Sequence, residues 1–161
     1  MEVEMKIRGL MMDPVTNTPI VILKDLNGNA VLPIWVGVYE ANAIALEIEK
    51  VATPRPMTHA LIKSLLLGLN TGLRKVVVSE LKDDTFYAVI WLDRDGELIS
   101  VDSRPSDALA LALRLDCPIY FEEGVLKSTK LASTVSDKVN TEEMRRWLEG
   151  LNDEDLGRYK M

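Results

Sequence analysis

The sequence predicts an α+β fold: a mainly antiparallel or mixed sheet built from two duplicated βββα units, with a C-terminal helix. Three observations predict it. Segments of alternating apolar and polar residues flank strong hairpin turns at Asn27-Gly28 and Asp95-Gly96. Segments with helical periodicity close each half of the repeated region. The two halves also share one pattern at a fixed offset, which predicts a duplicated unit.

The shared pattern is an internal repeat whose offset places Glu40 on Asp107. At this offset residues 40–46 lie over 107–113 with their alanines and both acids in register. Three upstream apolar segments, 10–13, 20–23 and 31–36, lie over 77–80, 87–90 and 98–103 in the same order. Chance similarity between amphipathic segments is the alternative, but it explains one matching element better than four.

The first half predicts three strands and a helix. Apolar and polar residues alternate over 3–10, as in a strand with one solvent-exposed face, and residues 19–25 and 30–36 form a hairpin. A helix over 38–50 follows and ends before Pro54 and Pro56, because proline cannot sit inside a helix. Its buried residues are expected to be Ala41, Ile44, Ala45 and Ile48.

The second half begins with a helix capped by Thr58 and then repeats the strand pattern. Strands are predicted over 73–82, 85–92, 97–102 and 118–122, with a buried helix over 105–115. Pro105 suits the first helical position, and Asp107 falls in the first turn, where the helix dipole favours negative charge. Trp35 and Trp91 lie in strands and are expected in the core. The second helix is expected to present one apolar face made of Leu61, Ile62, Leu65, Leu66 and Leu69.

Two regions are predicted along the chain. Residues 1–126 form the domain, and residues 127–161 form a linker, a last helix opening at Thr141 and a loose tail. The linker composition, small and polar, runs from Gly124 to Lys138. Met144, Trp147, Leu148 and Leu151 make the docking stripe of that last helix.

Composition limits the class of protein. The single cysteine, Cys117, excludes an intrachain disulfide and is expected to be a small buried hydrophobe. Neither a secretory leader nor a stretch long enough to span a membrane is visible, so we expect a cytoplasmic protein. A net charge of −6 argues against non-specific attraction to nucleic acid. Exposed strand edges and an apolar last helix favour a homo-oligomer.

Glycine-rich phosphate loops, paired-cysteine motifs and zinc-protease motifs are absent from the sequence, and His59 is its only histidine. The polar residues that can carry chemistry stand where strands end and helices begin: Glu40, His59, Asp102, Arg104 and Asp107. Carboxylates can hold Mg²⁺ or Mn²⁺, which activate water and neutralise a phosphate under attack. An arginine beside them can grip phosphate oxygens bidentately, and Arg55, stiffened between two prolines, can clamp an anion.

If the two repeats pack about their alanine-rich helices, Glu40, Asp102, Arg104 and Asp107 are expected in one cleft, with Arg55 and His59 at its rim. The converging helix N-termini would then favour bound anions. A structural interpretation stays open. Each acid then caps its own helix, and Arg104 pairs with Asp102 or Asp107. His59 is then a capping or partly buried structural histidine, and Arg55 forms a surface salt bridge.

Four separated blocks of sequence resemble the bifunctional nuclease domain family. They are 32–37 with Glu40-Ala41, 55–59, 85–88 and 102–108, and the likeness covers about residues 3–126. The resemblance implies hydrolysis of both DNA and RNA. Two departures stand out: Ala60, where the family often has an acid after the histidine, and Asp84, where it often has glycine.

The leading hypothesis is therefore a metal-assisted nuclease. Glu40, His59, Asp102 and Asp107 are its candidate catalytic residues, and Arg55 and Arg104 would bind substrate. Glu40, Asp102 and Asp107 would bind Mg²⁺ or Mn²⁺, and no organic cofactor is indicated. The alternative is a non-catalytic binding or regulatory module that acts as an oligomer, which suits the acidic composition. A stress-related assembly protein is a third hypothesis.

Overall fold

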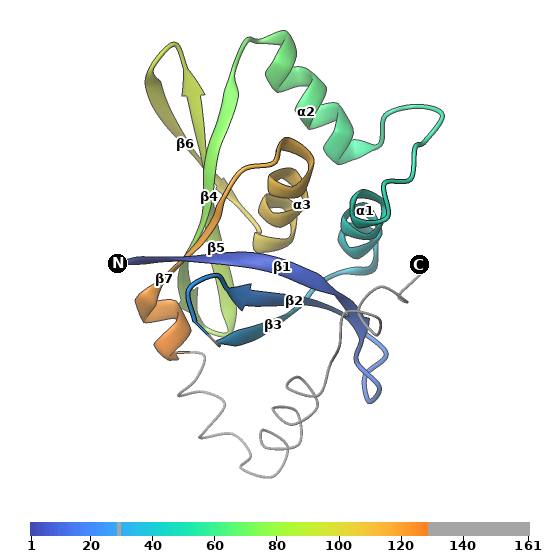
Figure 1. Ribbon diagram of the computed structural model, residues 1–161, viewed down its shortest axis with the longest axis vertical. Coiled ribbons are helices and arrows are strands. Elements are labelled where there is room, and N and C mark those ends of the chain that lie inside the picture. Colours follow the sequence, from blue (N-terminus) through green and yellow to red (C-terminus); the bar gives the residue numbers. More distant parts are fainter. Residues whose placement is uncertain (29, 129–161) are drawn as a thin grey trace.

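A computed structural model describes residues 1–28 and 30–128, which form a sheet with helices packed against it (Figure 1). The sheet has seven strands in the order β3-β2-β1-β7-β4-β5-β6. The strands are β1 (Glu2–Met12), β2 (Pro19–Asp25), β3 (Val31–Trp35), β4 (Gly72–Lys82), β5 (Thr85–Arg94), β6 (Glu97–Ser103) and β7 (Ile119–Glu122). The helices are α1 (Val38–Ile48), α2 (Thr58–Gly68) and α3 (Pro105–Leu115).

The sheet is mixed. β1 to β3 form one antiparallel meander and β4 to β6 form another. β7 joins them, antiparallel to β1 and parallel to β4. The predicted α+β fold with a mixed sheet is confirmed. The origin of the two meanders by duplication stays a prediction, although the strand order sets them on opposite sides of β7.

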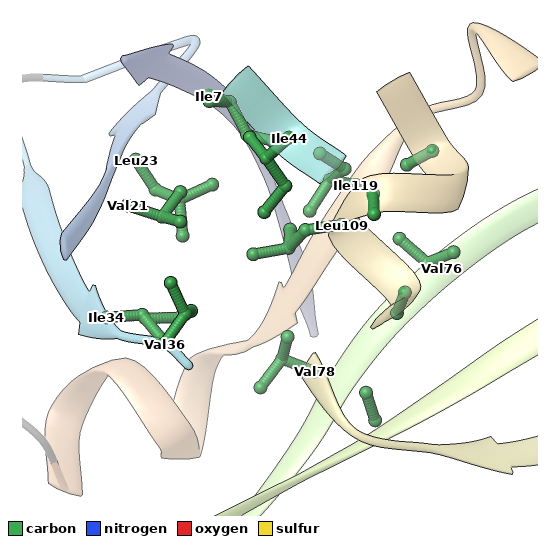
Figure 2. Packing of buried hydrophobic residues seen from close by; sticks show 14 of the residues in the cluster. Ile7, Val21, Leu23, Ile34, Val36, Ile44, Val76, Val78, Leu109 and Ile119 are labelled. Atoms are coloured by element: carbon green, nitrogen blue, oxygen red, sulfur yellow. The ribbon is translucent and has the colours of Figure 1, made fainter. Parts of the chain in front are cut away.

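The core lies between the sheet and helices α1 and α3 (Figure 2). Ile7, Val21 and Leu23 reach it from the first meander, and they meet Ile44 of α1 and Leu109 of α3. Alanines alternate with leucines along α3, so this helix can approach the sheet closely. As the sequence predicts, α3 is buried nearly all round, with these residues covered: Pro105, Ser106, Ala108, Leu109, Ala110, Leu111 and Ala112.

Helix α2 departs from the prediction of a buried leucine face. His59 is its one buried residue, whereas Leu61 and Leu65 are 51% and 55% exposed. Leu69, just past the helix, is also exposed, and Ile62 and Leu66 are half-buried. The leucine spacing identified the helix correctly, but the described residues supply no element that covers this side of it.

Three further predictions need correction or fall outside the described residues. Ile48 is exposed rather than buried. Residues 123–128 are helical where the composition predicted a loop from Gly124. The predicted last helix from Thr141 lies outside the described residues.

Cys117 is half-buried against the core, and burial, with the nearby Asp116 charge, raises the pKa of its thiol to about 11. None of the helices described here is long and apolar enough to cross a membrane.

Trp35 is not a core residue. Its side chain is 43% exposed, and the indole N–H donates to Asp13 Oδ2 at 3.0 Å. The same carboxylate accepts the backbone N–H of Val15 at 2.9 Å, which closes the turn between β1 and β2. The Trp35 bond, and then the Val15 bond, hold the pKa of the Asp13 carboxyl below its ordinary value.

We expect Trp35→Phe to lower the free energy of unfolding by about 1 kcal/mol at pH 7, the usual net contribution of such a hydrogen bond. Because the folded-state pKa of Asp13 is depressed, its stabilisation is present above the unfolded pKa and is lost as the pH falls through the folded pKa. Urea unfolding between pH 7 and 2.5 should show that the difference in free energy of unfolding between Trp35→Phe and wild type disappears below about pH 4. Trp91→Phe is the control, with a pH-independent gap; a constant gap for Trp35→Phe would contradict the assignment.

Candidate functional site

The N-terminal turns of three helices meet above the core. Glu40 lies in the first turn of α1, His59 in the first turn of α2, and Asp107 in the first turn of α3. Arg104 is the residue that precedes α3. The buried α3 brings them together because it packs against both α1 and α2. We call Glu40, His59, Arg104 and Asp107 the polar cluster.

Hydrogen bonds join the polar cluster in one line. Arg104 Nη2 lies 2.7 Å from Glu40 Oε1 and 2.9 Å from Asp107 Oδ2. Arg104 Nε also donates to Asp107 Oδ2, at 3.0 Å. On its other side Asp107 Oδ1 lies 2.8 Å from His59 Nε2. Both oxygens of Asp107 are therefore engaged, one by the guanidinium and one by the imidazole.

The cluster is most buried at Glu40 and His59 and open to solvent at Arg104. The side chains of Glu40 and His59 are 14% and 10% exposed, and that of Asp107 is 28% exposed, but that of Arg104 is 66% exposed. Hydrogen bonds to Asp107, and secondarily to Glu40, raise the pKa of Arg104 above its already high ordinary value. The guanidinium is therefore a fixed positive charge that faces solvent over two neutralising carboxylates.

Gly37 makes room for Glu40. It precedes α1, and a Cβ atom there would overlap Glu40 Oε2. The carboxylate can therefore fold back over the start of its own helix while its other oxygen reaches Arg104. The sequence predictions include Gly37 only in the block 32–37 and do not assign it a role in the site. The signal that it also positions an acid was its spacing, three residues before Glu40.

Asp102 does not join the polar cluster. Val101 pairs with Ile90, which belongs to the core beneath the helices, whereas Asp102 pairs with Val89. Because successive side chains of a strand point to opposite faces, Asp102 points to the face of the sheet away from the helices. The prediction that placed Asp102 in one cleft with Glu40 and Asp107 overlooked this alternation.

Arg55 forms no hydrogen bond or ion pair with the polar cluster within the described residues, and its predicted place at the rim stays a prediction. Arg55 is exposed in the segment between α1 and α2, where its backbone oxygen accepts a bond from Thr53 Oγ1 at 2.8 Å. Within residues 1–28 and 30–128, its guanidinium forms no ion pair. The alternative pairing of Arg104 with Asp107 is present, and the long-range contact with Glu40 accompanies it.

The arrangement does not fit a divalent ion as it stands. Glu40 Oε1 and Asp107 Oδ2 contact one nitrogen, so they lie no farther apart than the sum of those two distances, an upper limit slightly above the separation that two oxygen ligands of one metal ion can have. However, Arg104 occupies the place between them, and its positive charge repels a second cation. Across the described ranges, no group of three or more His, Cys, Asp and Glu side chains is arranged to hold a metal ion.

The cluster instead combines an anion grip with a proton carrier. An exposed guanidinium beside buried carboxylates can offer its free N–H groups to a phosphate. With the Asp107 carboxylate accepting from Nε2, the His59 ring is oriented and its Nδ1 is the nitrogen that can take up a proton. The same carboxylate holds both groups, so the positions of the arginine and the histidine are coupled.

Comparison with known proteins assigns most of the chain to a family. The family model described as the bifunctional nuclease domain matches residues 21–134, a span that includes the whole polar cluster. An uncharacterized protein of Mycobacterium tuberculosis is 38% identical over 162 residues, covering 95% of this chain and 97% of the relative.

Plant proteins whose names state an activity are more distant. Bifunctional nuclease 1 of Oryza sativa subsp. indica is 27% identical over 110 residues, which are 66% of this chain and 33% of the plant protein. Bifunctional nuclease 1 of Arabidopsis thaliana is 27% identical over 127 residues, 76% of this chain and 39% of its own length. The similarity therefore covers about a third of each plant protein.

We expect Arg104→Gln to lower the free energy of unfolding by about 1 kcal/mol. Loss of the cation leaves two close carboxylates facing each other, but exposure of the guanidinium limits the effect. Urea unfolding at low and at 1 M salt measures it, and the gap to wild type should narrow at high salt because screening weakens the lost ion pairs. Arg94→Gln, at an exposed position, is the matched control; an equal loss there would contradict a specific role for Arg104.

Proposed function

Because the chain belongs to the bifunctional nuclease domain family, we propose that it hydrolyses phosphodiester bonds of DNA and RNA. The observation that carries the proposal is the polar cluster, in which one carboxylate orients a histidine and an exposed arginine. The names of the plant relatives support the activity. The polar cluster is the candidate site for this activity, since phosphodiester hydrolysis needs a group that binds the phosphate anion and a group that transfers protons.

In this proposal Arg104 binds the scissile phosphate. Its guanidinium can donate N–H bonds to a phosphate on the solvent side, while Glu40 and Asp107 bind it on the inner side. The pairing also fixes the arginine before substrate arrives, so that little side-chain freedom is lost on binding. Glu40 is then a positioning residue, because it acts on the substrate only through Arg104.

His59 is the proposed general base. Water attacks the phosphorus while its proton passes to His59 Nδ1, and the bond from phosphorus to the leaving oxygen breaks. The leaving oxygen then receives a proton from solvent or from the imidazolium. Asp107 stabilises the positive charge that forms on the ring, as an aspartate does in other histidine–carboxylate pairs.

Mg²⁺ or Mn²⁺ remains part of the proposal as a condition to be tested. A divalent ion shared by Glu40 and Asp107 requires Arg104 to leave the place between them. The roles given above to Arg104 and His59 are independent of an ion.

We expect Asp107→Asn to reduce cleavage of single-stranded DNA and RNA by at least about 100-fold, because general-base catalysis contributes about that factor or more. Asp102→Asn is the matched control: it makes the same chemical change on the opposite face of the sheet and should keep wild-type activity. Initial rates with purified protein in Mg²⁺, in Mn²⁺ and in EDTA measure both the activity and its ion requirement.

Each outcome of this assay has a meaning. Equal rates for the two variants indicate a contaminating nuclease or a different site. Cleavage in EDTA that depends on Asp107 supports ion-free chemistry, and cleavage only with an added ion supports displacement of Arg104. Absence of cleavage by the wild type under all three conditions contradicts the proposal and favours a non-catalytic binding or regulatory module acting as an oligomer.

We also propose that the chain self-associates through a surface formed by α2 and β6. Both elements lie toward the same end of the long axis (Figure 1). Exposed apolar side chains gather on them: Leu61, Leu65 and Leu67 on α2, and Ile99 and Val101 on the helix-side face of β6. Apolar patches of this kind commonly mark protein interfaces.

A second copy of the chain is the partner that the edge strand favours. The sheet has two edges, β3 and β6, and Pro33 blocks the middle of β3. β6 has no proline and pairs with β5 alone. If two copies paired antiparallel about Ser100, Leu98 would face Asp102 and Ile99 would face Val101, so no like charges would oppose each other.

We expect light scattering coupled to size-exclusion chromatography to give more than the monomer mass for the wild type. Leu65→Glu should shift the protein toward monomer, because it places a charge in the proposed interface. Leu26→Glu, a change at a leucine of similar exposure outside α2 and β6, should leave the assembly unchanged. A monomeric wild type at all concentrations, or dissociation by both variants, would rule out this surface.

A further inference from the structure

Two lysines face each other across the first strand pair. Lys6 of β1 pairs with Lys24 of β2, next to the pair Ile7 and Leu23. Ile7 and Leu23 belong to the core beneath the helices. Because side chains alternate along a strand, Lys6 and Lys24 point to the opposite face of the sheet, away from the polar cluster.

The facing lysines repel each other, and no acidic side chain among the described residues pairs with either of them. Like charges directly opposite on neighbouring strands destabilise a sheet. Over the described ranges, the side chain of neither lysine forms a hydrogen bond or an ion pair. Lys75 on the same face provides the contrast, since its Nζ lies 3.0 Å from Glu2 Oε2 and 5.5 Å from the centre of the Tyr120 ring. The sheet thus neutralises one lysine on this face and leaves a facing pair.

The lysine pair opens into a hollow of about 390 Å³. Arg8 lines it as well, at the point where the ladder between β1 and β2 is irregular. Asp25 is the only acid of the lining, and its Oδ1 already accepts the backbone N–H of Asn27 at 2.9 Å. The complete lining is Lys6, Ile7, Arg8, Lys24, Asp25 and Leu26.

We propose that this hollow binds a phosphate-bearing anion of about mononucleotide size. Lys6 and Lys24 against the one carboxylate of Asp25 give the lining a net positive charge without counting Arg8, in a chain whose net charge is −6. A doubly charged phosphate between Lys6 and Lys24 would convert their repulsion into two charge-assisted contacts. The volume is in the range of small-molecule sites, and the exposed Leu26 offers apolar surface to the remainder of the ligand.

This binding is separate from hydrolysis at the polar cluster, because the two places use opposite faces of the sheet. Phosphate of this kind has two sources, a free phosphorylated compound or one phosphate of a nucleic acid chain. The probes are therefore inorganic phosphate, adenosine monophosphate and a single-stranded DNA oligonucleotide, each added to the full chain at ionic strength matched with NaCl.

Thermal unfolding and titration calorimetry test the proposal. A ligand that binds only the folded state stabilises it by an amount that grows with the logarithm of the ligand concentration above Kd, so adenosine monophosphate should raise the wild-type Tm with concentration. The double variant Lys6→Gln/Lys24→Gln should weaken its binding at least tenfold. Lys82→Gln/Arg94→Gln, which removes the same charge at exposed positions elsewhere, should keep the affinity within about twofold.

The ligand-free variants keep the test independent of folding defects. Lys24→Gln should raise the Tm of the free protein, because it removes the like-charge contact. Binding of the oligonucleotide alone, lost in the lysine variant, supports a nucleic acid phosphate; binding of either small probe supports a free phosphorylated compound. Failure of all three probes to bind, or equal weakening in the control variant, would overturn the proposal. Neither result bears on hydrolysis at Asp107.

Discussion

The burial of α3 nearly all round is the constraint on which the arrangement of the site depends. A helix without a polar face can be covered only by apolar elements on all sides, and α3 accordingly packs against α1, α2, β4 and β5. Polar groups can then remain only at its ends. Arg104 and Asp107 stand at the beginning of the helix, so the packing that covers α3 also delivers Glu40 and His59 to them.

Arg104 resolves an electrostatic conflict that this packing creates. Acids are favourable in the first turn of a helix, and α1 and α3 each have one there. When the two helices converge, their acids come close and would repel each other. A guanidinium can bond both carboxylates at once in fixed geometry, which the single charged nitrogen of lysine does less well. One arginine therefore makes both helix starts compatible.

Local signals in the sequence were sufficient for the elements, but not for what covers them. The Asp83-Asp84 turn was recognisable between two apolar strands, and both residues adopt left-handed φ angles of 51° and 61°. Asp84 thus fills the position where the family often has glycine, and aspartate tolerates that conformation. The leucine spacing of α2 predicted the helix but not that its leucines are exposed, because periodicity does not show whether another element covers the apolar side of a helix. Asp102 was misplaced although strand alternation carried the signal, and the Glu40–Arg104 contact joins distant residues whose only sequence trace was the repeat.

Charge sets the conditions under which the polar cluster can receive a phosphate. With His59 neutral, Glu40, Asp107 and Arg104 carry one net negative charge, so an approaching phosphate gains from Arg104 but is repelled by the acids. Burial of Glu40 helps here, because its carboxylate is turned to the guanidinium while the guanidinium itself faces solvent. A proton on His59 would bring the cluster to neutrality and favour the anion. It would also remove the base that hydrolysis needs, so anion binding and proton uptake place opposite demands on one imidazole, and Asp107, which contacts both cations, is the residue that balances them.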